Sequence, residues 1–162
     1  MKDLSVKRRS KLRAKEAKEI LAWMEEEWGV VLPPEPEVES GFLDGRRVFI
    51  MGGRLVGVEE EGGFLLTVHG ILLLKPAKGW VTVDMGAVRF IANGADVMSP
   101  GRVGACDMIE KGDLVWVRDE KNLRPLSVGR ALMSGSEMVA SETGKAIRTL
   151  HYVGDDIWNA EL

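Results

Sequence analysis

The stretch from residue 81 to residue 117 constrains the fold most, because it predicts a series of short elements whose order leaves little freedom. It begins with β-branched residues at 81–84, which indicate a strand. That strand ends on Asp84, an acidic residue suited to cap the helix expected over residues 85–92. An Asn-Gly pair then ends the helix, since both residues tolerate the left-handed backbone found at helix C-termini.

Two further strands are expected after this helix. The first is short, at 95–98, and stops at a Ser-Pro-Gly break where Pro fixes one backbone angle and Gly frees the next. The second, at 114–117, follows a Lys-Gly-Asp turn directly ahead of an apolar run. The stretch therefore predicts a compact order of strand, helix, glycine turn and two strands.

Three pieces of this region, taken in order, resemble a known family. They are residues 94–103, the Gly-Asp pair at 112–113, and residues 125–131. Their sequence and spacing are similar to those of the PUA domain, a small pseudo-barrel found in RNA-modifying enzymes and translation factors. The resemblance implies a PUA β pseudo-barrel in the C-terminal half of the chain.

Composition excludes several other classes of protein. The chain has 162 residues, of which 45% are apolar, enough for one medium or two small cores. Its longest apolar run, at 64–74, is too short for a membrane helix, and no signal peptide is recognisable, so we expect a cytoplasmic protein without a membrane partner. One cysteine, Cys106, and two histidines, His69 and His151, predict no disulfide, no metal site and no cofactor.

Charge is distributed unevenly along the chain. The net charge is −3, which argues against indiscriminate nucleic-acid binding. Residues 1–18 nevertheless hold eight Lys and Arg against two acids, a net of +6, so the other 144 residues carry −9. The positive charge is thus concentrated at the N-terminus.

A long helix is predicted near the N-terminus, with Ser10 as its N-cap, its end near Trp28 and Gly29 as its stop. Its apolar residues share one face, so packing against a domain is the simpler interpretation. Cations crowded at a helix N-terminus oppose the macrodipole, however, and this favours a role in binding phosphate. The expected basic surface consists of Lys7, Arg8, Arg9, Lys11, Arg13 and Lys15.

The rest of the N-terminal half is expected to form an extended connector followed by an antiparallel meander. Asp-Gly and Gly-Gly turns separate expected strands at 38–42, 47–51 and 55–58. Residues 64–74 fit either a buried strand or a short buried helix, because a continuous apolar run has no usable period. The predicted fold class is α+β, with a small α/β pre-PUA domain at 1–78 followed by the PUA domain at 79–162.

The C-terminal half also resembles one branch of PUA proteins, that of malignant T-cell amplified sequence and of the N-terminal part of ligatin, a translation initiation factor. The residues that carry the resemblance are 83–90, 94–101, 128–129 and the ending 150–158. It implies RNA binding on the small ribosomal subunit or to tRNA, in initiation, re-initiation or recycling. It also implies either a separate partner protein with a fold shared by a start-codon selection factor, or an archaeal-like version that works differently.

The resemblance implies an RNA-binding face made by the first helix, the glycine loop and adjacent strands. Glycines expose backbone N–H groups, Arg offers a planar charged fork, and Met98 could lie under a base or equally face the core. Gly94 and Gly101 are also explained by turns alone. The expected face consists of Arg89, Asn93, Gly94, Ala95, Asp96, Met98, Ser99, Pro100, Gly101 and Arg102, with Lys145, Arg148 and His151 as neighbours.

Three functions remain open from the sequence. The first is a non-catalytic RNA-binding translation factor. The second is an accessory RNA-targeting subunit of an RNA-modification system, for whose catalytic aspartate motifs the chain offers no candidate. The third is a protein-interaction module whose acidic segment at 19–78, net −6, docks a basic partner. No catalytic residue is predicted.

Overall fold

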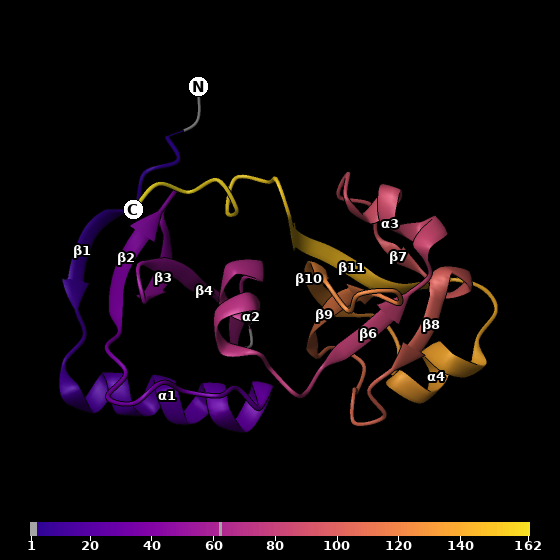
Figure 1. The fold of residues 1–162 in the computed structure, drawn as a ribbon, viewed down its shortest axis with the longest axis horizontal. Helices are drawn as coiled ribbons and strands as arrows, with labels where there is room; N and C mark the ends of the chain where they lie inside the picture. Colours follow the sequence, from indigo (N-terminus) through magenta and orange to yellow (C-terminus); the bar gives the residue numbers. More distant parts are fainter. Residues whose placement is uncertain (1–2, 62) are drawn as a thin grey trace. The chain divides into compact units, whose positions relative to one another are not determined.

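The computed structural model describes residues 3–61 and 63–162 of the chain, apart from the side chain of Arg102 (Figure 1). It divides into two compact units. Unit 1 runs to Ala77 and also contains Asp156–Leu162, whereas unit 2 is Lys78–Asp155. The sequence placed these last seven residues with the PUA domain, so this part of the predicted division differs from the structure.

Unit 1 is built on an antiparallel sheet with strand order β1-β2-β3-β4-β5 and two helices. The predicted meander appears as β2, β3 and β4. The elements are β1 (Lys7–Lys11), α1 (Ala14–Trp28), β2 (Glu39–Leu43), β3 (Arg46–Met51), β4 (Arg54–Glu60), β5 (Gly63–Leu66) and α2 (Val68–Leu74).

The predicted start of the first helix is wrong. Ser10 does not cap a helix but lies in β1, opposite Ser40 of β2. Helix α1 begins four residues later, with Arg13 at the N-cap and no side-chain capping bond. Pairing with β2 gives residues 7–11 a strand conformation that their local sequence does not indicate. The other end is as predicted, because Gly29 has a φ of 61° and closes the helix.

The ambiguous apolar run at 64–74 contains both of the elements that were considered. Strand β5 takes its first part and α2 its second, and Thr67 separates them. The Thr67 side chain accepts a hydrogen bond from the Gly70 N–H at 3.0 Å, while its hydroxyl donates to the Leu55 carbonyl at 2.6 Å. A Cβ at position 70 would lie 2.3 Å from the Val56 carbonyl oxygen, so only glycine lets α2 approach β4 this closely.

The C-terminal segment completes unit 1. Trp158 stacks on His69 with ring centroids 3.8 Å apart, and the Nε2 atom of His69 lies 3.1 Å from the Trp158 carbonyl oxygen. Glu161 pairs with the N-terminal segment, accepting from the Val6 N–H and donating to the Leu4 carbonyl, both at 2.8 Å. His69 is therefore a packed, hydrogen-bonded residue.

Unit 2 is a mixed, curled sheet with strand order β7-β11-β10-β9-β6-β8, in which β6 and β9 run parallel. This is the predicted pseudo-barrel, and the whole chain has the predicted α+β class. Its elements are β6 (Trp80–Val83), α3 (Met85–Ile91), β7 (Val97–Met98), the 3₁₀ turn η1 (Ser99–Gly101), β8 (Arg102–Ala105), β9 (Leu114–Asp119), β10 (Pro125–Ala131), α4 (Gly135–Ala140) and β11 (Lys145–Tyr152).

Alternating residues of the central strands form the core of unit 2. Val81 and Val83 of β6 and Val115 and Val117 of β9 are fully buried and pack with Ile147 of β11. The sequence missed β8, which has only four residues and includes a glycine. It also missed α4, although Ser134 and Glu137 have the spacing of a capping box and form one.

Candidate nucleic-acid interface

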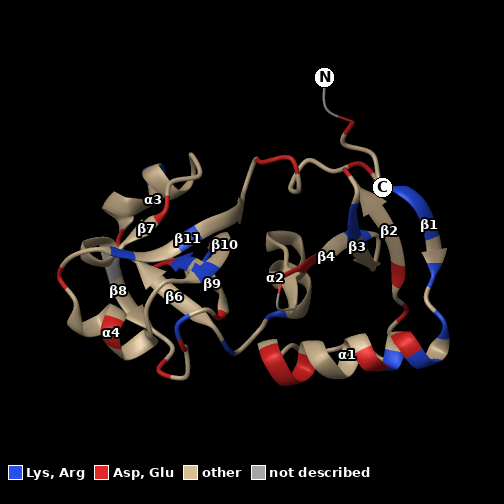
Figure 2. Ribbon diagram, turned by 180° about the vertical axis from the view of Figure 1, so that it is seen from behind, with Lys and Arg blue, Asp and Glu red and all other residues tan. Residues whose placement is uncertain are grey.

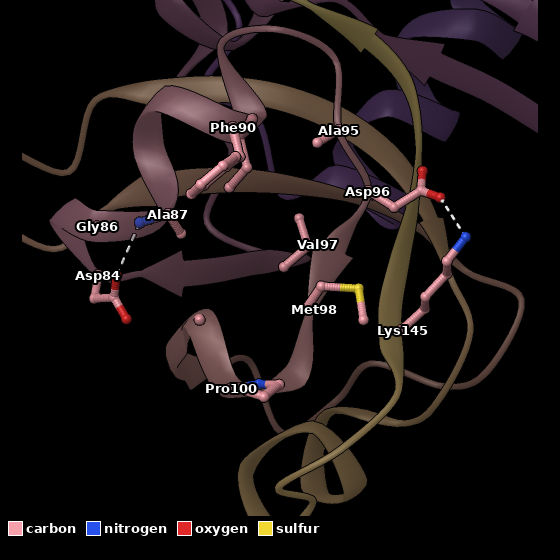
Figure 3. A pocket seen from close by; sticks show the side chains of 12 residues that line it. Asp84, Gly86, Ala87, Phe90, Ala95, Asp96, Val97, Met98, Pro100 and Lys145 are labelled. Carbon is pink, nitrogen blue, oxygen red and sulfur yellow. Dashed lines mark hydrogen bonds and ion pairs between the residues drawn. The ribbon is translucent and has the colours of Figure 1, made fainter.

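Unit 2 contains a groove of about 620 Å³ bounded by α3, the loop after it, η1 and the start of β11 (Figure 3). Most of the groups that line it are apolar or small. They are Asp84, Gly86, Ala87, Phe90, Ile91, Ala95, Asp96, Val97, Met98, Pro100, Gly101 and Lys145. The predicted RNA-binding segment thus surrounds a real hollow.

Local capping positions α3 at one wall of this groove. The Oδ1 atom of Asp84 accepts a hydrogen bond from the Ala87 N–H at 2.9 Å, as the sequence predicted. The Asp84 N–H donates to the Gly101 carbonyl at 2.9 Å and so ties the helix start to η1. A Cβ at position 101 would lie 3.2 Å from the Ala87 Cβ, so these small residues set the width of the groove here.

Three large apolar side chains in and beside the groove are exposed to solvent. Phe90 is 55% exposed, Met98 46% and Met85 45%. Phe90 lies on α3 and Met98 on β7, and both line the groove. A folded chain gains nothing from leaving such side chains in water, so a cluster of them at a hollow indicates a binding surface.

Asp96 holds the loop after α3 against β11. Its Oδ1 atom accepts from the Thr149 N–H at 2.9 Å, and its Oδ2 atom lies 3.1 Å from the Lys145 Nζ. The Thr149 hydroxyl donates to the Ala95 carbonyl at 2.9 Å. The Thr149 N–H, followed by Lys145, lowers the pKa of Asp96 below its usual value. Asp96 and Lys145, which both line the groove, form an ion pair.

The structure separates the predicted site residues into those that line the groove and those that do not. Those that line the groove are Ala95, Asp96, Met98, Pro100, Gly101 and Lys145. Arg89 and Arg148 do not line it but are exposed on α3 and β11. The Arg89 guanidinium lies 4.9 Å from the centre of the Phe90 ring, at the edge of the groove. The side chain of Arg102 lies outside the described part of the structure.

Four predicted residues have structural roles instead. Ser99 and His151 are fully buried, so the structure does not present either side chain to a ligand. His151 pairs through Nδ1 with the Asp155 carboxylate at 2.9 Å. Asn93 donates from Nδ2 to the Arg89 carbonyl at 2.9 Å, and Gly94, with a φ of 88°, packs against the Tyr152 ring.

The most exposed aromatic residue of the groove was not predicted. The sequence places Phe90 in the helix expected over residues 85–92 and not in the expected RNA-binding face. Ile91, its neighbour, is the residue that faces the core. Two adjacent apolar residues on a helix point about 100° apart, and this was the available signal that one of them must leave the core.

The predicted basic surface lies in unit 1. Lys7, Arg8, Arg9 and Lys11 belong to β1, Arg13 is the N-cap of α1, and Lys15 lies in its first turn. All six are exposed. Figure 2 shows the resulting band of basic residues along β1 and into the start of α1.

Residues 3–61 and 63–162 hold no cluster of three or more His, Cys, Asp or Glu side chains suited to a metal ion. Within the same residues, no helix has the length and apolar character needed to cross a bilayer.

Comparison with known proteins identifies the family. Residues 79–153 match the family model described as the PUA domain. A solved structure titled a conserved PUA domain protein, from Thermoplasma acidophilum, superposes with a TM-score of 0.83 at 30% identity, covering 94% of this chain and 98% of that chain. The chain belongs to the PUA-domain protein family. This confirms the family, the C-terminal fold and the α+β class predicted from the sequence.

Relatives of this PUA protein include archaeal and eukaryotic chains. An uncharacterized protein of Methanocaldococcus jannaschii is 37% identical over 159 residues, which cover 96% of this chain and 98% of that protein. Translation machinery-associated protein 20 of Schizosaccharomyces pombe is 38% identical over 86 residues, and a malignant T-cell-amplified sequence 1 homolog of Drosophila melanogaster is 37% identical over 82 residues. The matches span 48% and 45% of those two proteins, about half of each.

Proposed function

We propose that this PUA protein is a non-catalytic RNA-binding protein that acts in translation, and that its groove holds an unpaired stretch of rRNA or tRNA. The observation that carries the proposal is the exposed apolar lining of the groove by Phe90 and Met98, with the cation Arg89 against the Phe90 ring. A second cation, Arg148, is exposed on β11. In RNA recognition, apolar side chains usually stack on bases, whereas cations contact phosphates.

The shape and charge of the groove favour a base over a phosphate as its occupant. A hollow of about 620 Å³ suits one or two unstacked nucleotides, whereas an A-form duplex is recognised across an open surface. The charged side chains that line it are Asp84, Asp96 and Lys145, so acids outnumber cations inside. Phosphates would therefore lie at the rim, near Arg89 and Arg148, and the base would lie within.

Several features support binding without catalysis. Asp96 and Lys145 are engaged with each other at 3.1 Å, and Asp84 caps α3, so the ionisable side chains of the groove already have structural partners. General acid–base chemistry needs groups that converge on a substrate with adjusted pKa values. The groove supplies an apolar surface for binding instead.

The names of the relatives support a place in translation. One is a translation machinery-associated protein, although this chain spans only about half of it. The small ribosomal subunit and tRNA are the RNA partners that we propose, with initiation, re-initiation or recycling as the step. A separate partner protein, similar in fold to a start-codon selection factor, completes the proposal.

Binding measurements with a matched pair of variants test this function. The purified protein is titrated with small ribosomal subunits, initiator tRNA and an unrelated RNA hairpin at several salt concentrations. Replacing Phe90 and Met98 by Ala should weaken subunit or tRNA binding about tenfold to hundredfold, because base stacking contributes ~1–3 kcal/mol per base. Replacing Met108 and Val139 by Ala removes two exposed apolar residues elsewhere in unit 2 and should change nothing. Equal binding of all the RNAs, or an equal loss of affinity in both variants, would show that the groove is not the RNA-binding site.

A protein-interaction function has one specific observation in its favour. Leu72 and Leu73 of α2 are 51% and 42% exposed beside a hollow of about 390 Å³ that also contacts Arg54, His69 and Trp158. This patch suits an apolar protein segment better than RNA. If the RNA titrations show no binding, replacing both leucines by Ser and measuring association with small ribosomal subunits would test this second candidate.

A further inference from the structure

Strand β1 is an unusual edge strand. It lies at the end of the sheet of unit 1, pairs only with β2 in the strand order, and has the sequence Lys-Arg-Arg-Ser-Lys. All five of its side chains are exposed. Charged residues are a common protection of sheet edges against aggregation, so charge on β1 has a structural explanation of its own. That explanation does not account for which of these cations are paired.

The cations of this region divide into two sets. Lys7 pairs with Asp3 at 3.1 Å, Arg9 with Glu39 at 2.9 Å and Lys11 with Glu37 at 3.2 Å. Their acidic partners lie within unit 1 and neutralise them locally. The second set has no acidic partner among the residues that the structure describes, and its members are Arg8, Arg13 and Lys15.

The backbone holds Arg8 in an uncommon conformation. The register between β1 and β2 shifts between Lys7 and Ser10, which is a bulge, and Arg8 has a φ of 54°. A residue other than glycine is strained there by about 1 kcal/mol or more. Bulges change the direction of a side chain, and strained residues gather at functional positions. A glycine or asparagine would adopt this conformation more easily, so stability does not explain an arginine.

The start of α1 adds two cations that stability also does not explain. Arg13 occupies the N-cap without a side-chain hydrogen bond to the helix, and Lys15 lies one residue into it. The partial positive charge of a helix N-terminus repels both, at a cost of a few tenths of a kcal/mol each. The residues that nature prefers at an N-cap are Ser, Thr, Asp and Asn.

From these observations we infer a second phosphate-binding surface, made of Arg8, Arg13 and Lys15, that contacts the RNA backbone independently of the groove. We call it the β1 surface. It rests on the proposed function, since it assigns a second contact to the same RNA. These three exposed cations lie within eight residues and have no acidic partner in the described part of the chain, so they are suited to successive phosphates of a strand. Neutralisation by phosphates offsets the free-energy cost of placing them there.

The composition of the region favours RNA over an anionic membrane as the partner. Membrane-surface segments insert an apolar face beneath their cations. Strand β1 offers only Lys, Arg and Ser side chains, and all of them are exposed. Phosphates of an RNA strand require charge and hydrogen bonds alone, which Arg supplies with its planar fork.

The test compares three variants with the intact protein. The first replaces Arg8, Arg13 and Lys15 by Ala. A control replaces Lys111, Lys121 and Arg124, three exposed cations elsewhere, by Ala and so changes the net charge equally. The third is the groove variant with Phe90 and Met98 replaced by Ala. Binding to small ribosomal subunits and to initiator tRNA is measured from about 50 to 300 mM salt, and thermal melting verifies that each variant is folded.

The expected result is specific to the β1 variant. Its RNA affinity should fall about tenfold, and the slope of log affinity against log salt should become shallower by about 2, since each phosphate contact to a single strand contributes ~0.7. The groove variant should lose affinity with its slope unchanged. A β1 variant that is folded and behaves like its charge-matched control overturns the inference, while loss in the groove variant still supports the proposed function.

Two further outcomes test the proposed function and the β1 surface. If the intact protein binds none of the RNAs, the proposed function fails and the β1 surface fails with it. Vesicles containing phosphatidylserine serve as the alternative partner. Binding to these vesicles that depends on the three cations, with RNA affinity unaffected by their removal, also overturns the inference.

Discussion

The groove of unit 2 and the β1 surface of unit 1 differ in almost every physical property. The groove is hollow and largely apolar, and it is part of a unit whose ten Lys and Arg balance ten Asp and Glu. The β1 surface consists of three cations at a sheet edge and at the start of α1, in a stretch of 18 residues with a net charge of +6. The groove can hold a flat, neutral group, whereas the β1 surface can bind only charged groups such as phosphates.

Under the proposed function, this difference assigns the two tasks of RNA recognition to two separate surfaces. Contacts to bases discriminate between sequences and structures, whereas contacts to phosphates add affinity that falls with salt. A chain that makes these two kinds of contact on separate surfaces can change its selectivity and its affinity independently. The net charge of −3 then keeps the whole molecule from binding polyanions indiscriminately. Each prediction below changes one side of this comparison.

Closing the groove should have the largest effect. Replacing Gly101 by Val adds a Cβ only 3.2 Å from the Ala87 Cβ, and its two methyl groups occupy space between α3 and η1. We expect tRNA or subunit affinity to fall by at least tenfold, because the groove excludes its base, with the salt dependence of binding unchanged. Fluorescence titration measures both quantities. Gly101→Ala is the graded control with a smaller loss, and wild-type affinity in the Val variant would show that the groove is not the site.

Charge inside the groove should matter less. The Asp96–Lys145 ion pair, at 3.1 Å, competes with phosphates for Lys145. Asp96→Asn keeps an oxygen for the Thr149 N–H, frees Lys145, and should raise RNA affinity about twofold to fivefold, in line with the small strength of exposed ion pairs. Lys145→Met should lower affinity by a similar factor.

A double-mutant cycle separates this effect from a general change in charge. In the variant with both Asp96→Asn and Lys145→Met, the gain from Asp96→Asn should disappear. If the gain persists without Lys145, then Asp96 acts by repelling RNA directly. Asp107→Asn removes one exposed carboxylate elsewhere in unit 2 and provides the charge-matched control.

The smallest effect concerns acid stability. The pKa of Asp96 is lowered, chiefly by the Thr149 N–H, so its ionised form stabilises the fold at pH values above its unfolded pKa of 3.8. This contribution is lost as the pH falls through the lower, folded pKa. Asp96→Asn should therefore destabilise the protein by about 1 kcal/mol at pH 7 and by less at pH 3. Thermal melting of the intact protein and the variant at pH 7 and at pH 3 measures the destabilisation. Equal destabilisation at the two pH values would contradict the assigned hydrogen bond.

Local sequence determined several elements of unit 2 and the way these elements begin and end. Asp84 caps α3, and Gly94 has the left-handed backbone expected just beyond it. The strands β6, β7 and β9 lie where strands were expected at 81–84, 95–98 and 114–117. Such features depend on neighbours within four residues, so they can be read without knowing the fold. The family resemblance rested on the same local features and was confirmed.

Tertiary structure alone decided which side chains meet and which remain in water. Ser99 and His151 belong to the predicted face by sequence, yet both are buried, whereas Phe90 is exposed on the wall of the groove. Residues 7–11 form a strand only because β2 lies beside them, and Trp158 packs on His69 across 89 positions of sequence. Exposure and pairing depend on contacts between distant segments. They are therefore properties of the assembled chain, which no local pattern of residues specifies.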